Sequence, residues 1–170
     1  MTGKGYMPPP VRHDWQTPDC VLERVRKVGE IYLDPCTSAD NPTGAMKFYT
    51  EADDGLSRSW KHKHRKKVTF VNPPYGRSLG VWSDKIIDEH MNGTSIIALV
   101  PSRTDTKWFT RMVTVASDIG FIRGRLTFKG ATAPAPFPSV LFYFGGPNGG
   151  AAFQCAFQDM CWFREKGGSE

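Results

Sequence analysis

VTFVNPPYG, residues 68–76, joins a β-branched apolar run to an asparagine, two prolines and a tyrosine. The apolar run predicts a buried strand over residues 68–72. Neither a strand nor a helix can continue through two consecutive prolines, which lack backbone donors and fix two φ angles. We therefore expect Asn72 and Tyr75 on a stiff turn at the end of a buried strand, where they could form one wall of a pocket.

Outward from this stretch, the chain alternates short apolar runs with amphipathic segments. Thr17 and Pro18 predict a helix start, with a hydroxyl cap and a proline in the first turn. Strands are predicted at 31–33, 95–100, 119–122 and 140–144, helices at 79–90 and 106–116, and a last strand or helix at 153–163. This order predicts an α/β fold whose central sheet is mostly parallel, with helices on both faces.

The composition, with 39% hydrophobic and 12% aromatic residues over 170 positions, predicts one globular domain. We expect that domain at 13–165, between a flexible arm at 1–12 and a disordered tail at 166–170. No apolar run approaches the roughly 18 residues of a membrane span, and no signal-peptide core is present, so a cytoplasmic protein is expected. The four scattered cysteines indicate reduced thiols rather than a disulfide or zinc framework.

Three strands run directly into polar turns marked by proline. They are YLDPCTS (32–38), FVNPPYG (70–76) and ALVPSR (98–103). In open α/β sheets, ligands bind in the crevice beyond the carboxyl ends of such strands. Aligned on one rim, Asp34, Asn72 and Ser102 therefore mark the predicted site.

The side chains on this rim suit an amine. The Asn72 oxygen and a proline carbonyl are two acceptors that can converge on a nitrogen with two hydrogens, such as the exocyclic amine of adenine. Tyr75 offers an aromatic face, and stacking of a base on such a face contributes about 1–3 kcal/mol. No charged base is required, because orientation and dipole placement promote attack by the amine.

Acidic residues flank the rim. Asp34 either accepts hydrogen bonds from a ligand ammonium or water, or only forms its turn. Asp53 and Asp54 follow some twenty residues later, at the usual distance of a ribose-binding acid, although DDG is also a common solvated turn. Without GxGxxG or GxxxxGK, a dinucleotide or NTP site is not expected. An adenosine-bearing cofactor without phosphates fits better.

These motifs together carry a family resemblance. NPPY matches the (D/N/S)PP(Y/F) signature of S-adenosylmethionine-dependent amino-methyltransferases, and residues 14–145 resemble the phage DNA N-6-adenine-methyltransferase (Dam-like) family. The family's motifs occur in order: WxTP at 15–18, DPC at 34–36 followed by Asn41, DGL…W at 54–60, NPPY at 72–75, and RGRLxF at 123–128.

The resemblance implies a Rossmann-like methyltransferase fold that transfers a methyl group from S-adenosylmethionine to the exocyclic amine of a flipped-out adenine in DNA. It implies that the target base is held by Asn72, Pro73, Pro74 and Tyr75. It implies a cofactor site lined by Thr17, Pro18, Asp34, Pro35, Cys36 and Asn41, with Asp54 and Asp53 near the ribose or adenine. The first turn reads DPCTSAD where DPFxGxG is usual, so cofactor contacts there are expected to differ.

The segment 35–71 is too short for the two strands and three helices that a complete methyltransferase sheet has there. One edge of the sheet is therefore expected to be trimmed to a single strand or a loop. There is likewise no room for a separate target-recognition domain, so loops must contact the DNA.

A net charge of +5 and a pI of about 9.1 suit a polyanionic partner. Much of the excess lies in KHKHRKK (61–67), either a solvated loop or a phosphate-binding patch, and no metal is expected because His62 and His64 lack a third ligand nearby. Candidates that would offset the few kcal/mol of base flipping are Lys61, Lys63, Arg65, Lys66, Arg77, Arg103, Arg123 and Arg125, with Phe128 as a second stacking surface. Each arginine has a surface salt bridge as its alternative, and the loop 132–138 either borders the groove or is a plain connection.

Two rival functions remain open from the sequence. The NPPY signature also serves N-methylation of RNA bases and of protein glutamine. A basic, catalytically idle module that binds nucleic acid on the same scaffold would bind DNA in a salt-sensitive manner, unaffected by cofactor. The sequence leaves open the recognition site, the choice between duplex and single-stranded DNA, and the oligomeric state.

Overall fold

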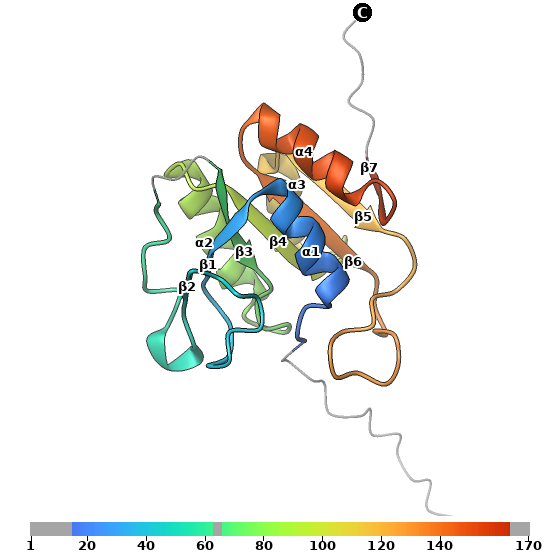
Figure 1. Cartoon of the computed structure of the whole chain (residues 1–170), viewed down its shortest axis with the longest axis horizontal. Helices are drawn as coiled ribbons and strands as arrows, with labels where there is room; N and C mark the ends of the chain where they lie inside the picture. Colours follow the sequence, from blue (N-terminus) through green and yellow to red (C-terminus); the bar gives the residue numbers. More distant parts are fainter. Residues whose placement is uncertain (1–14, 63–65, 164–170) are drawn as a thin grey trace, which may run out of the picture.

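The structure, a computed structural model, describes residues 15–62 and 66–163, so the predicted arm and tail lie outside the described residues. Its centre is a seven-stranded sheet in the order β2-β1-β3-β4-β6-β5-β7 (Figure 1). The strands are β1 (Glu30–Asp34), β2 (Lys47–Phe48), β3 (Lys67–Val71), β4 (Ile96–Pro101), β5 (Asp118–Ile122), β6 (Ser139–Phe144) and β7 (Cys161–Phe163).

Strand directions place the predicted rim at one edge of the sheet. The neighbouring strands β2, β1, β3 and β4 all run parallel, so their carboxyl ends meet at the lower edge in Figure 1. Strand β6 runs antiparallel between β4 and β5. Every residue of β4 and of β6 is buried, as expected of central strands covered on both faces. The prediction of a central sheet that is mostly parallel is confirmed.

Helices cover both faces of the sheet. The helices are α1 (Asp19–Val28), α2 (Leu79–Met91), α3 (Lys107–Val115) and α4 (Pro147–Phe157). Helices α1 and α4 contact each other on one face, and α2 and α3 contact each other on the opposite face (Figure 1). The predicted hydroxyl cap at Thr17 is wrong, because α1 starts after Pro18 without a side-chain cap and the Thr17 hydroxyl accepts a hydrogen bond from Asn72 instead.

The two edges of the sheet differ. Between β1 and β3 the described residues form only the two-residue strand β2 and the 3-10 turn η1 (Glu51–Asp53), so the predicted trimmed edge is confirmed. At the other edge, β7 pairs antiparallel with β5. The open choice between a strand and a helix at 153–163 resolves into both, since α4 ends at Phe157 and β7 begins at Cys161.

The DGL…W segment docks under the turn that follows β1. A Cβ on Gly55 would lie 1.9 Å from the carbonyl oxygen of Pro35, so only glycine allows this approach. The indole of Trp60, fully buried, donates from Nε1 to the Gly55 carbonyl at 2.8 Å. These two contacts hold η1 and its neighbours against the rim.

The Gly55→Ala change is expected to lower the free energy of unfolding by about 3 kcal/mol, because the Pro35 backbone must move to admit the methyl group. The matched control is Gly80→Ala in α2, where an added Cβ meets nothing within 4 Å. That control should raise stability by about 0.5–1 kcal/mol through helix propensity. Urea unfolding followed by tryptophan fluorescence measures both, and equal effects of the two changes would contradict the close contact.

Candidate active site

The turns after β1, β3 and β4 meet at one rim, as predicted. Asp34 ends β1 and Asn72 directly follows β3, and the backbone of Asn72 is near enough to the Cys36 thiol to oppose the rise of its pKa. Ser102 follows β4, and its N–H donates to the carbonyl of Pro138 at 2.9 Å. The loop that ends at Pro138 therefore borders the rim.

The side-chain amide of Asn72 is oriented by its nitrogen. Nδ2 donates to the backbone carbonyl of Trp15 and, at 3.0 Å, to the hydroxyl of Thr17. The oxygen Oδ1 is buried and has no hydrogen-bond partner within the described part of the chain. A buried acceptor without a partner costs about 1–3 kcal/mol, so this oxygen is a binding position for a donor supplied by a ligand.

Aromatic rings cover the NPPY turn. Tyr75 is only 5% exposed, and its ring centroid lies 6.1 Å from Phe128 and 5.5 Å from Phe137. Trp15 lies 5.0 Å from Phe128 and 5.5 Å from Phe137. Tyr75 thus presents no open face for stacking in this conformation, and Phe128, 1% exposed, lies beneath the same rings. A base that reaches Asn72 must displace a ring of this cluster.

Asp34 acts within its own turn. The carboxylate accepts from the Cys36 N–H at 3.1 Å and from the Thr43 hydroxyl at 2.9 Å. Burial raises the pKa of Asp34 to about 6, against the opposing effect of these hydrogen bonds. Burial and the Asp34 charge raise the pKa of Cys36 well above its usual range, so this thiol is neutral. Asp34 therefore stabilises its own turn, independently of any contact with a ligand.

Asn41 shapes the loop after this turn. Its φ of 46° lies in the left-handed region, which asparagine tolerates better than most residues. Its side chain accepts from the Ala45 N–H at 3.1 Å and donates to the Ala45 carbonyl at 3.0 Å. It also accepts from Thr43, which in turn binds Asp34. Asn41 and Thr43 brace the Asp34 turn, and the sequence analysis missed Thr43.

The acids of η1 are exposed at the same edge as the Asp34 turn. Asp53 accepts from the N–H and the hydroxyl of Thr50, and these hydrogen bonds lower the pKa of Asp53. Asp54, at a φ of 49°, is exposed and precedes the glycine that touches Pro35. Both carboxylates are accessible to a ligand at the trimmed edge.

The predicted phosphate contacts divide into two sets. Arg77 and Arg125 are exposed, and neither has an ion pair with any residue of 15–62 or 66–163. Arg103 pairs with Asp105 at 3.4 Å, so its salt-bridge alternative is present. Arg123 donates to the carbonyls at the end of α4, Gln158 and Asp159. Arg77 and Arg125 are thus the freer candidates.

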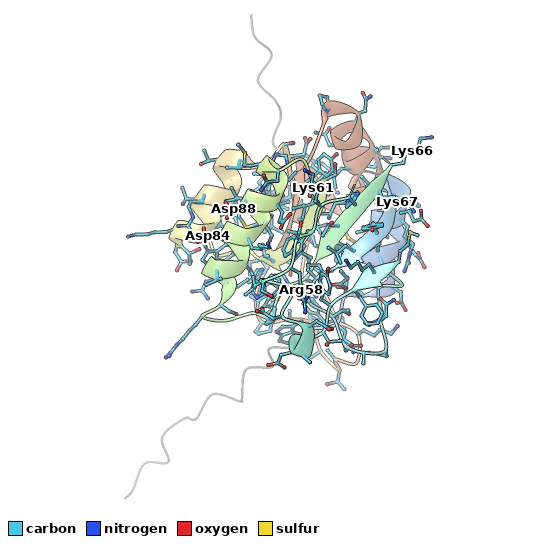
Figure 2. The ribbon with its side chains drawn as sticks, turned by 90° about the vertical axis from the view of Figure 1, so that its left-hand side faces the viewer. Arg58, Lys61, Lys66, Lys67, Asp84 and Asp88 are labelled. Atoms are coloured by element: carbon cyan, nitrogen blue, oxygen red, sulfur yellow. The ribbon has the colours of Figure 1, made fainter. Side chains whose placement is uncertain are left out.

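The described residues of the basic segment 61–67 lie away from Asn72. Lys66 and Lys67 are at the start of β3, whereas the NPPY turn follows its end, and five strand residues span roughly 16 Å. Figure 2 shows Lys66 and Lys67 at the end of β3 remote from η1, with Arg58 close to η1. Lys61 and Lys66 are exposed, Lys67 pairs with Glu30 at 3.0 Å, and the predicted contacts Lys63 and Arg65 lie outside the described residues.

Charge is segregated along the rim. The segment 34–54, on the β1–β2 side of Asn72, carries one basic residue, Lys47, against five acids: Asp34, Asp40, Glu51, Asp53 and Asp54. On the other side, the charged residues of the loops after β3, β4 and β5 are mostly arginine and lysine. A cationic ligand fits the acidic side and a polyanion fits the basic side. The sulfonium and ammonium groups of S-adenosylmethionine suit the acidic side in this respect.

A sheet in which β6 is inserted antiparallel between β4 and β5, with NPPY closing β3, defines a Rossmann-like S-adenosylmethionine-dependent methyltransferase. Comparison with protein families makes this specific. The model of the family DNA N-6-adenine-methyltransferase (Dam) matches residues 4–138, and the chain belongs to this family. It is an adenine-specific DNA methyltransferase that uses S-adenosylmethionine.

None of the curated proteins compared with the chain matches it. Within the described residues, no helix has the length and apolar character that a membrane crossing requires. The ring of His62, which the sequence analysis did not expect to bind a metal, packs on the ring of Tyr32, with their centroids 4.7 Å apart.

Asp34 gives the site a pH signature. Its pKa is raised from 3.8 to about 6 by burial, so the folded state holds the proton more tightly than the unfolded state. Its contribution to stability is full below pH 4 and is lost as the pH rises through 6. Relative to Asp34→Asn, the unfolding free energy of the wild type should fall by about 2 kcal/mol between pH 4 and 7. Urea titrations across this range measure the difference, and parallel curves would contradict the buried carboxyl.

Proposed function

We propose that Asn72 and Pro73 hold the exocyclic amine of the target adenine, between a cofactor on the acidic side of the rim and DNA on the basic side. The observation that carries this proposal is the Asn72 amide, whose nitrogen is occupied by Trp15 and Thr17 and whose oxygen is left buried and without a partner. An amine that donates one hydrogen to Oδ1 and the other to the Pro73 carbonyl satisfies that oxygen.

The same arrangement favours transfer to the amine. S-adenosylmethionine, when bound, supplies a methyl group on a positively charged sulfur. The N6 lone pair forms the new N–C bond as the S–C bond breaks, and one N6 proton then leaves to water. The nitrogen gains positive charge during attack, and the two oxygen dipoles aimed at it stabilise that charge. Tyr75 and Pro74 complete the turn that fixes these dipoles.

For the cofactor, we propose a site around the Asp34 turn and η1. Exposed Asp53 and Asp54 are placed to accept hydrogen bonds from a ribose or a cofactor adenine. Within the turn, Asp34 and Asn41 act mainly by fixing the backbone near Cys36. The full set proposed to line the site is Thr17, Pro18, Asp34, Pro35, Cys36, Asn41, Asp53 and Asp54.

For DNA, we propose that Arg77 and Arg125 contact phosphates next to a flipped-out adenine. Both are exposed on loops at the rim and have no ion pair in the described ranges. Arg103 and Arg123 lie on the same side and would have to exchange their present partners for phosphate. Either duplex or single-stranded DNA can present an adenine in this way. With four free cysteines and a DNA substrate, we propose a cytoplasmic location, in a bacterial host if the chain is phage-encoded.

Replacing Asn72 by alanine is expected to lower methyl transfer to DNA by about 10³-fold, because it removes one of the two dipoles that hold the amine. Cofactor affinity should stay within a few-fold of the wild type. The matched control is Asn92→Ala at the end of α2, where the amide only donates to Asp88. Turnover and isothermal titration measure the two effects, and unchanged turnover of the Asn72 variant would refute its role.

The DNA proposal predicts a difference in salt dependence. The double change Arg77→Ser and Arg125→Ser should reduce the slope of log K against log salt by up to about 2 for duplex DNA. The matched double change Lys61→Ser and Lys66→Ser removes the same charge at the far end of β3. Its slope should stay closer to that of the wild type. The reverse order of effects would place the DNA on the 61–67 segment instead of the rim.

A further inference from the structure

Two buried polar atoms of opposite kind lie in the aromatic cluster above the NPPY turn. One is the acceptor Asn72 Oδ1, and the other is the donor Nε1 of Trp15, and neither has a partner among the described residues. The two residues are joined directly, since the Asn72 amide donates to the Trp15 carbonyl. An unsatisfied acceptor and an unsatisfied donor on two residues in contact match a ligand that offers the complementary pair.

The indole of Trp15 is fixed in place. The next residue, Gln16, forms an antiparallel bridge with Lys129, whose N–H donates to the Gln16 carbonyl at 2.9 Å. The indole ring itself packs against Phe128 and Phe137. Backbone and ring contacts thus orient Nε1 before any ligand binds, which lowers the entropy cost of using it.

The ring of Phe137 packs against both Trp15 and Tyr75. Its ring centroid is 5.5 Å from both Trp15 and Tyr75, and it is nearly edge-on to each, at 89° and 72°. Phe137 belongs to the irregular segment 132–138 and is partly exposed. A planar base that took the place of this ring would contact Trp15 and Tyr75, and Asn72 is hydrogen-bonded to the backbone of Trp15.

We propose that Trp15 is an adenine-recognition residue, whose indole N–H donates to a ring nitrogen beside the amine held by Asn72. In adenine the N6 amine is flanked by two such acceptors, N1 and N7. Guanine and thymine present a carbonyl oxygen where adenine presents the amine, and that oxygen would face Asn72 Oδ1 unfavourably. Trp15 and Asn72 together therefore recognise a donor next to an acceptor, a pair that adenine offers and that guanine and thymine do not offer at this position. This inference rests on the proposed role of Asn72.

The test pairs a protein change with a change in the base. Trp15→Phe keeps an aromatic ring and removes the N–H, and DNA that carries 1-deaza- or 7-deaza-adenine at the target replaces one ring nitrogen by C–H. The wild type should lose about tenfold in kcat/KM and in DNA affinity on one of the two analogues. Trp15→Phe should lose about tenfold on adenine, and should no longer distinguish adenine from that analogue.

The control is Trp162→Phe on β7, where a half-exposed indole stacks on Phe121 away from the NPPY turn. It should keep the discrimination of the wild type. The proposal is overturned if the wild type treats both analogues like adenine, a measurement that needs no variant. It is also overturned if the loss on an analogue persists undiminished in Trp15→Phe.

A failure of the Asn72 role has a different signature. With Asn72→Ala, methyl transfer is expected to be lost while DNA affinity still distinguishes adenine from the critical analogue, because Trp15 remains. Methyl transfer by Asn72→Ala would refute the role of Asn72. The role of Trp15 is decided separately, by whether Trp15→Phe loses the discrimination between adenine and the analogue.

Discussion

The chemistry proposed for this rim depends on the orientation of one amide. Because Nδ2 of Asn72 donates to Trp15 and Thr17, the oxygen is left buried and without a partner among the described residues, and under the proposed function the substrate amine donates to it. A flipped amide would aim two N–H groups at an amine and repel it. The segment that enters α1 must therefore cross the end of β3, so catalysis depends on how α1 is attached to the sheet as well as on the NPPY turn.

The scaffold could be predicted from local sequence patterns. The side-chain contacts of the site could not, because they join residues that are far apart in sequence. The prolines after β3 and the apolar runs identified the rim, because these signals come from residues close together in sequence. The trimmed edge followed from the short length of segment 35–71 compared with a complete methyltransferase sheet. The partner of Thr17 is 55 positions away, and no local signal distinguishes that contact from a helix cap. Likewise, the cover over Tyr75 comes from Phe128 and Phe137, which the chain brings back from a distant loop. Lys66 is only a few positions from the prolines in sequence, yet strand β3 runs between them, so they lie at opposite ends of the sheet.

The structure also divides the family motifs by what their residues do. Gly55 and Trp60 are required for close packing under Pro35, and Asn41 braces the loop that follows through its left-handed backbone. In this chain the turn DPCTSAD is thus held by side chains, where a glycine-rich turn would rely on backbone flexibility. A motif residue can therefore be indispensable without touching either substrate, and contact has to be argued from the position of each side chain.

The distribution of charge follows from placing both ligands on one sheet edge. A cationic methyl donor and a polyanionic acceptor have to meet at a single nitrogen, and their binding surfaces cannot overlap without one repelling its own ligand. The trimmed β1–β2 edge carries the acidic side chains, and the loops after β3, β4 and β5 carry arginine and lysine side chains. Asn72 lies at the boundary between them. The amide is neutral, so it adds no charge that would favour one ligand over the other. That neutrality is consistent with the proposed function, in which orientation and not a charged base activates the amine.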